Sequence, residues 1–196
     1  MALVTIVKEA LSALVVVGLA GMAFFFIGAA WKNRVLGKLR LFVTRNALYF
    51  AFAAALIATS GSLFFSEIAH YDPCKLCWFQ RIFMYPLAVM FAVAIWKKDM
   101  RVRRYALPLA VIGAPIAAYH YGLQVYNAIS PITSSCSATG PSCASTPIMT
   151  FGFVTIPLMA LVAFLIIIVS MALLGRGKGT KGAGRATATH PKKVSG

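Results

Sequence analysis

The sequence predicts an all-α integral membrane protein that crosses the bilayer several times. Hydrophobic residues make up 60% of the 196 residues and charged residues only 12%, whereas about a quarter of the residues in an average soluble protein are charged. The charges stand in short clusters between long uncharged runs. A soluble globular domain is therefore excluded. A disordered or nucleic-acid-binding polycation is excluded as well, because such a chain would have low hydrophobicity.

Five uncharged runs are long enough to cross a hydrocarbon core of about 30 Å, which takes about 20 helical residues. The predicted spans are 10–31, 46–66, a third that ends at Trp96, 105–126 and 150–174. We interpret the first run as a transmembrane helix and not as a cleaved signal peptide. Its apolar stretch is longer than the roughly 7–15 residues that are usual in a signal sequence.

Basic residues indicate how these spans are oriented, since loops rich in Lys and Arg stay on the cytoplasmic side of a membrane. Such clusters occupy residues 32–45, residues 97–104 and the tail after Gly175. The loops after the second and the fourth span carry almost none. The sequence therefore predicts a cytoplasmic C-terminus, an external N-terminus and two external loops. The Gly-rich tail, residues 176–196, is expected to be flexible.

All four cysteines lie in the two predicted external loops, which suggests disulfide chemistry on the oxidising side of the membrane. Cys74 and Cys77 form a Cys-x-x-Cys motif, and Cys136 and Cys143 lie in a loop of Ser, Thr, Gly and Pro. Four cysteines allow three pairings. Static disulfides or half of a zinc site are the alternatives. The second pair has the wrong spacing for structural zinc, and we expect no metal.

Asp72 and Pro73 predict a helix start directly before the motif, because Asp caps free backbone N–H groups and Pro suits the first helical position. Cys74 would then lie in the first turn, where the helix dipole stabilises a thiolate and lowers the thiol pKa. A helix from Pro73 to Trp96 has the length of a membrane span. The uncharged run that begins at Ile82 covers only about 22 Å.

This helix places Arg81 at the edge of the hydrocarbon, on the same face as Cys74 and Cys77. A charge at that depth is a functional candidate. The guanidinium could stabilise a Cys77 thiolate or bind a polar group of a ligand. The alternative is a structural arginine whose head reaches the membrane interface.

The run Pro73-Cys74-x-Leu76-Cys77-x-x-Gln80-Arg81 resembles the signature of the disulfide-bond formation protein B family, especially its BdbC-type branch. The runs 119–124 and 155–158 are similar to that branch too. The resemblance covers about 46–174 and implies an antiparallel four-helix transmembrane bundle at 46–175. Residues 1–45 would then add an extra N-terminal transmembrane helix and a basic cytoplasmic loop. In the related vitamin K epoxide reductase-like proteins the cysteine pairs come in the reverse order.

The resemblance implies a quinone-dependent protein thiol–disulfide oxidoreductase of the bacterial cytoplasmic membrane. A soluble or membrane-tethered thioredoxin-like oxidase would pass its electrons to the Cys136–Cys143 disulfide, and thiol–disulfide exchange would pass them to Cys74–Cys77. The final acceptor would be ubiquinone or menaquinone. Cys136 would react with the partner protein, and Cys143 with Cys74. The relay would support disulfide formation in exported proteins.

The resemblance also places the quinone ring at Cys77, with Arg81 holding the quinone oxygen or the adjacent thiolate. Gln80, His120 and Gln124 are the other candidates for the quinone pocket, and the last two share a helix face. His120 can equally be a hydrogen-bonded residue of an interfacial aromatic belt. The alternative function is a non-catalytic scaffold or transporter subunit with static disulfides. A channel or carrier is disfavoured because the spans lack carboxylates.

Overall fold

The computed structural model describes residues 2–30, 34–130, 141–146 and 148–182. The elements in chain order are α1 (Ala2–Ala30), α2 (Arg34–Arg45), α3 (Ala47–Leu63), the π-helical turn η1 (Phe64–Ile68), α4 (Lys75–Lys97), the 3-10 turn η2 (Met100–Val102), α5 (Arg103–Ile129) and α6 (Ile156–Gly182). The extended backbone within the described ranges pairs only as an isolated bridge between Thr150 and Val154. The fold is therefore all-α, as predicted.

Within the described ranges, five segments are long and apolar enough to cross a membrane. They are Ala2–Ile27, Ala47–Ile68, Lys75–Lys97, Met100–Ile129 and Ile156–Gly175. The five spans that the sequence predicts are confirmed, with ends that shift by a few residues. The chain is thus a multi-pass membrane protein.

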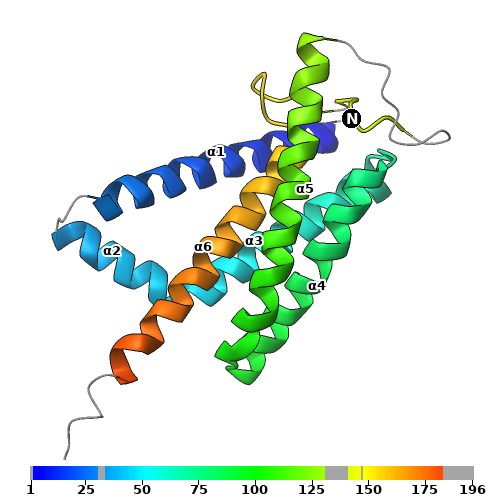
Figure 1. Ribbon diagram of the computed structural model, residues 1–196. Helices are drawn as coiled ribbons and strands as arrows, with labels where there is room; N and C mark the ends of the chain where they lie inside the picture. Colours follow the sequence, from blue (N-terminus) through cyan, green and yellow to red (C-terminus); the bar gives the residue numbers. More distant parts are fainter. Residues whose placement is uncertain (1, 31–33, 131–140, 147, 183–196) are drawn as a thin grey trace, which may run out of the picture.

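Helices α3 to α6 form an antiparallel bundle in which each helix packs on two neighbours. The contacts join α3 to α4, α4 to α5, α5 to α6 and α6 back to α3. In Figure 1, α3 and α5 run toward the end of the bundle where α4 begins, and α4 and α6 run back. Helix α1 lies outside this ring and packs on α6. The predicted arrangement of four core helices and one additional N-terminal helix is confirmed.

The inward faces of α4 and α5 change from apolar to polar toward one end of the bundle. Small buried residues recur on α5 every three or four positions: Ala106, Ala110, Ala114 and Ala117. Such residues let transmembrane helices approach closely. The same face continues to His120 and Gln124, which are also buried. On α4 the buried face runs from Phe91 through Leu87 and Met84 to Gln80. Two packing faces therefore carry polar side chains into one interior site.

Helix α4 begins at Lys75, later than the predicted start at Pro73. The chain leaves η1 through His70, whose φ is 55°, and stays outside regular structure up to Cys74. Cys74 is the N-cap residue, with extended backbone at φ −69° and ψ 170°. The prediction of a first-turn Cys74 after an Asp72 cap is therefore wrong. The helix still measures about 34 Å at 1.5 Å per residue, enough to span a bilayer core.

Two segments that were expected to be irregular are helical. Residues 34–45, predicted as a basic loop, form α2, because their apolar and basic residues alternate in the pattern of an amphipathic helix. Helix α6 continues to Gly182, so residues 176–182 of the predicted flexible tail are helical as well. Residues 183–196 lie outside the described ranges.

Gly113 of α5 lies directly against Phe164 of α6, and this contact gives a stability prediction. A Cβ at Gly113 would collide with the ring of Phe164 on α6, whereas Gly122 on the same helix has open space around it. Ala is favoured over Gly in a helix by up to about 1 kcal/mol, so Gly122→Ala should keep or raise the thermal midpoint in detergent. Gly113→Ala should lower the free energy of unfolding by roughly 1–3 kcal/mol, because Phe164 must move. Equal midpoints for the two variants would contradict this packing.

Candidate redox site

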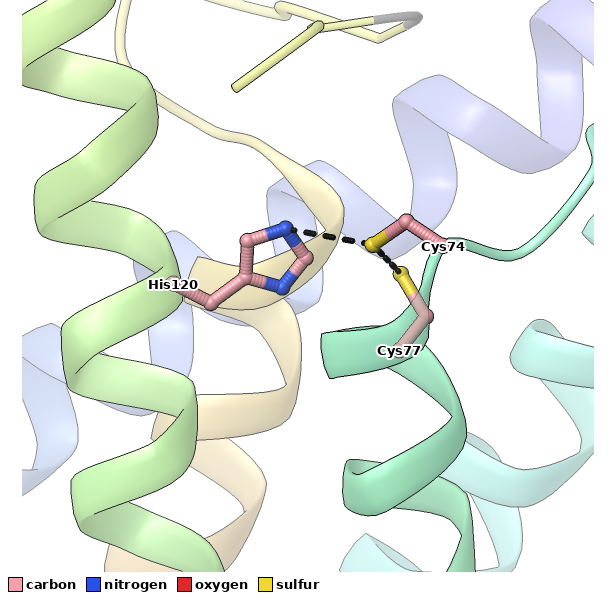
Figure 2. A group of neighbouring side chains, drawn as sticks. All are labelled: Cys74, Cys77 and His120. Atoms are coloured by element: carbon pink, nitrogen blue, oxygen red, sulfur yellow. Dashed lines mark hydrogen bonds between the residues drawn. The ribbon is translucent and has the colours of Figure 1, made fainter. Parts of the chain in front are cut away.

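Two sulfur atoms and one imidazole meet where α4 begins. The Sγ atom of Cys74 lies 3.3 Å from the Sγ atom of Cys77 and 3.6 Å from Nε2 of His120. Figure 2 shows the ring of His120 reaching from α5 toward the two cysteines at the start of α4. Cys74 and His120 are buried, and Cys77 is half-buried. Residues that are 46 positions apart in the chain thus form one cluster.

The hydrogen bonds of His120 determine which ring nitrogen carries the proton. Nε2 lies 3.0 Å from the backbone oxygen of Cys143. A carbonyl oxygen only accepts, so Nε2 carries a hydrogen. In the neutral ring Nδ1 is then an acceptor, and the amide nitrogen of Gln80, at 2.9 Å, is its donor. His120 therefore presents a hydrogen-bond donor on the side where the Cys74 sulfur lies.

Cys74 keeps its proton in the reduced pair. The Cys74 thiol donates to the sulfur of Cys77, and this bond, together with burial, raises the pKa of Cys74 to about 12. The prediction of a lowered pKa for Cys74 is wrong, because this residue is the N-cap and the donor of the pair and not a thiolate within the first turn. Cys77 accepts the bond from inside the first turn. It is the sulfur that this arrangement prepares to carry negative charge.

The Arg81 side chain extends toward α3, where its guanidinium binds Ser62. Its Nε donates to Ser62 Oγ at 3.0 Å, and its Nη2 donates to the Ser62 backbone oxygen at 3.1 Å. The guanidinium carbon lies 5.5 Å from the ring centroid of Trp78, and the Tyr85 hydroxyl donates to Ser62 Oγ at 3.2 Å. The Arg81 guanidinium is still close enough to Cys77 for their charges to interact. The sequence did not predict that Ser62 and Tyr85 belong to the surroundings of Arg81, because a single hydroxyl in an apolar helix carries no distinguishing signal.

Gln124 joins the second cysteine loop to α5. Its Nε2 donates to the Ser145 backbone oxygen at 2.9 Å, and its Oε1 is buried without a hydrogen-bond partner within the described residues. Cys143, in the same loop, is fully buried and lies close enough to Cys77 for their charges to interact. Cys136, the other predicted loop cysteine, lies outside the described residues.

An apolar cavity of about 480 Å³ opens at this cluster. The predicted site residues that reach it are Cys74, Cys77, Gln80, Arg81, His120 and Gln124. Most of the other lining side chains are apolar and come from α1, α3, α4 and α6. Such a cavity fits a molecule with a polar head and an apolar body.

The cluster also contains donor atoms that suit a metal ion. The ligand atoms of Cys74, Cys77 and His120 lie within 4.8 Å of one another. Structural zinc sites use four ligands, and this group of described residues supplies three. The Nε2 hydrogen of His120 also faces the carbonyl oxygen of Cys143, so the ring presents no lone pair to an ion there. The arrangement favours thiol chemistry.

Known proteins match this chain over the segment that contains the cluster. The family model described as "Disulfide bond formation protein DsbB" matches residues 44–174. The chain belongs to the DsbB family. The resemblance seen in the sequence is thereby confirmed, and the family implies thiol–disulfide oxidoreductase activity in a membrane protein.

Curated relatives of this DsbB-family protein carry related names. The "Probable disulfide formation protein C 1" of Bacillus cereus is 46% identical over 132 residues, which cover 67% of this chain and 94% of the relative. The "Disulfide bond formation protein C" of Bacillus subtilis is 48% identical over 127 residues, or 65% of this chain and 91% of the relative. No solved structure gives a significant match.

The different states of the two thiols generate a prediction about chemical modification. In the reduced DsbB-family protein at pH 8, iodoacetamide should alkylate Cys77 roughly a thousand times faster than Cys74, which is buried and has its thiol pKa raised to about 12, because only about 0.01% of such a thiol is thiolate at this pH. The rate at Cys74 should rise about tenfold per pH unit up to about pH 11, because the thiolate fraction grows at that rate below the pKa. Trypsin cleaves after Lys75 and separates the two cysteines for mass spectrometry. Faster alkylation of Cys74 at pH 8 would contradict the assignment.

Proposed function

We propose that this DsbB-family protein reoxidises a thioredoxin-like thiol oxidase outside the cytoplasm and passes the electrons to a membrane quinone. The observation that carries the proposal is that the cluster of Cys74, Cys77 and His120 opens into an apolar cavity of about 480 Å³ among the transmembrane helices. A thiol pair that exchanged only with soluble proteins would need no such cavity. The activity would support disulfide formation in exported proteins.

The residues around the cavity fit a quinone, either ubiquinone or menaquinone. At the polar end, the Arg81 guanidinium has N–H groups beyond the two that bind Ser62, and these are donors suited to a ring oxygen. The buried Oε1 of Gln124, which has no partner within the described residues, is an acceptor suited to a quinol hydroxyl. The apolar lining suits an isoprenoid chain. A bound quinone would supply an acceptor for the two electrons and two protons that the Cys74–Cys77 dithiol loses on becoming a disulfide.

The second cysteine loop is the proposed entry point for electrons. A thiolate of the reduced partner would exchange with the Cys136–Cys143 disulfide through Cys136, so that the partner is oxidised and the loop pair reduced. Cys143 would then attack Cys74 and release the Cys77 thiolate, and Cys136 would displace Cys74 to restore the loop disulfide. Each exchange breaks one S–S bond and forms one. The burial of Cys143 beside the cluster supports this order.

His120 and Gln80 act on Cys74 in this scheme. When Cys136 displaces Cys74, the leaving sulfur carries negative charge, and a charge-assisted hydrogen bond from Nε2 of His120 stabilises it. This hydrogen bond acts in the direction of lowering the pKa of Cys74. Gln80 is a positioning residue, because its amide donates to Nδ1 and keeps the proton on Nε2.

The proposed location is the bacterial cytoplasmic membrane, with the cysteine cluster at the external face. In Figure 1 the N-terminal end of α1 lies at the end of the bundle where α4 begins, and the turn between α4 and α5 lies at the opposite end. That turn contains the basic cluster 97–104. Retention of basic segments in the cytoplasm supports external cysteine loops and a cytoplasmic C-terminus.

The test is quinone reduction by the purified full-length protein in detergent, followed by absorbance, with a reduced thioredoxin-like dithiol protein as electron donor. The wild type should turn over, and Cys77→Ser should lose all turnover, because the helix pair can no longer form its disulfide. His120→Phe should lower the rate by about 10²–10³-fold, the range found when one preorganised hydrogen-bond donor is removed.

The matched control is His70→Phe, which replaces an exposed histidine and should keep the rate within about twofold of wild type. If the wild type reduces neither ubiquinone nor menaquinone with such a donor, the proposal fails. The alternative of a scaffold with static disulfides would then be favoured. Equal rates for His120→Phe and His70→Phe would remove His120 from the mechanism.

A further inference from the structure

Helix α1 lies outside residues 44–174, the part of the chain that matches the family model, yet it lines the cavity. The cavity residues on α1 are Leu11, Leu14, Val15, Val17 and Gly18. They extend over two turns of the helix, and none has a polar side chain. An element additional to the family core therefore forms part of the wall around the proposed acceptor site.

Two glycines let α1 approach the bundle closely. A Cβ on Gly18 would lie 3.3 Å from Val162 and 3.4 Å from Ile166 of α6, and a Cβ on Gly61 of α3 would lie 3.0 Å from Leu11. Such small-residue contacts are typical of specific packing between transmembrane helices. At these two positions α1 is therefore packed closely against α6 and α3.

Val15 is buried in a cluster of its own with residues of the α6 region, which are Val154, Leu158 and Val162. Ser12 of α1 is also fully buried, and its hydroxyl donates a hydrogen bond to the Lys8 backbone oxygen. Its polar group is thus satisfied within α1 and leaves the helix face apolar toward the bundle.

The cavity is long as well as apolar. Its lining along α3 and η1 extends from Phe50 to Phe65, which corresponds to about 22 Å of helix at 1.5 Å per residue. The sulfurs, Arg81 and His120 lie toward the Phe65 end, because Arg81 binds Ser62. Residues toward Phe50, such as Ala54 and Ile57, are apolar. A ring alone would occupy only the polar end, whereas a chain attached to the ring would follow α3 past α1.

We propose that α1 binds the isoprenoid tail of the quinone, with Leu14 and Val17 in contact with the chain. The proposal rests on the proposed function, because it concerns the same acceptor site. The contact is purely apolar, so it contributes to affinity for long-tailed quinones and leaves the thiol chemistry unchanged. In this account α1 closes a groove that the four core helices would leave open toward the lipid.

The first test is photolabelling of the full-length protein in nanodiscs with a quinone whose isoprenoid tail carries a diazirine. Trypsin cleaves after Lys8 and Lys32 and releases residues 9–32 as one peptide. We expect label in this peptide, lowered at least fivefold by Leu14→Trp and by Val17→Trp. The control is Val16→Trp, which makes the same change at a neighbouring position that does not line the cavity; it should keep the label.

The second readout is kinetic and uses the same variants. Val17→Trp should raise the KM for a long-tailed quinone roughly tenfold, the factor expected when about two methylene groups lose their contacts. Its KM for a ring analogue without a tail should stay within twofold. Label confined to peptides of α3, α4 and α6, or equal effects of Val16→Trp and Val17→Trp, would overturn the role of α1 while wild-type turnover persists. A wild type without turnover would overturn the proposed function itself.

Discussion

A histidine buried among transmembrane helices needs a partner for each ring nitrogen, and His120 finds them on separate segments. Gln80 on α4 donates to one nitrogen, and the backbone oxygen of Cys143 in the outer loop accepts from the other. These two bonds fix the ring beside Cys74 and also tie the loop to the start of α4. The packing of small residues on α5 against α4 makes this geometry possible, because it brings the polar ends of both helices to one interior point.

The same arrangement separates the two sulfurs chemically. Cys74 lies at the N-cap, buried and hydrogen-bonded as a donor, so it stays protonated until exchange begins. Cys77 lies inside the first turn and borders the apolar cavity. Both sulfurs border the cavity, and Cys143 is buried beside them. In the proposed relay Cys74 would exchange with the loop cysteine and Cys77 would face the acceptor, so that an aqueous partner and a membrane acceptor never need to share a solvent.

The spans and the closeness of Cys74 to Cys77 could be predicted from the sequence, because hydropathy over about 20 residues and a Cys-x-x-Cys spacing are local signals. The protonation of Cys74 could not, since it depends on whether α4 begins at Pro73 or at Lys75, and helix ends are set by differences of one or two residues. The partner of Arg81 was missed because Ser62 lies on another helix. The backbone oxygen of Cys143 carries no sequence signal at all. The contribution of α1 depends on tertiary packing through Gly18 and Gly61, which hydropathy does not encode.

In the proposed relay, electrons pass from the loop to α4 by direct exchange between Cys143 and Cys74. The most direct measurement uses the double variant Cys77→Ser and Cys136→Ser, which leaves these two cysteines alone in the chain. After mild oxidation of the purified protein, mass spectrometry of its peptides should find an intramolecular Cys74–Cys143 disulfide in most molecules. If both cysteines instead remain as thiols that can be alkylated after unfolding, direct exchange at this cluster is contradicted.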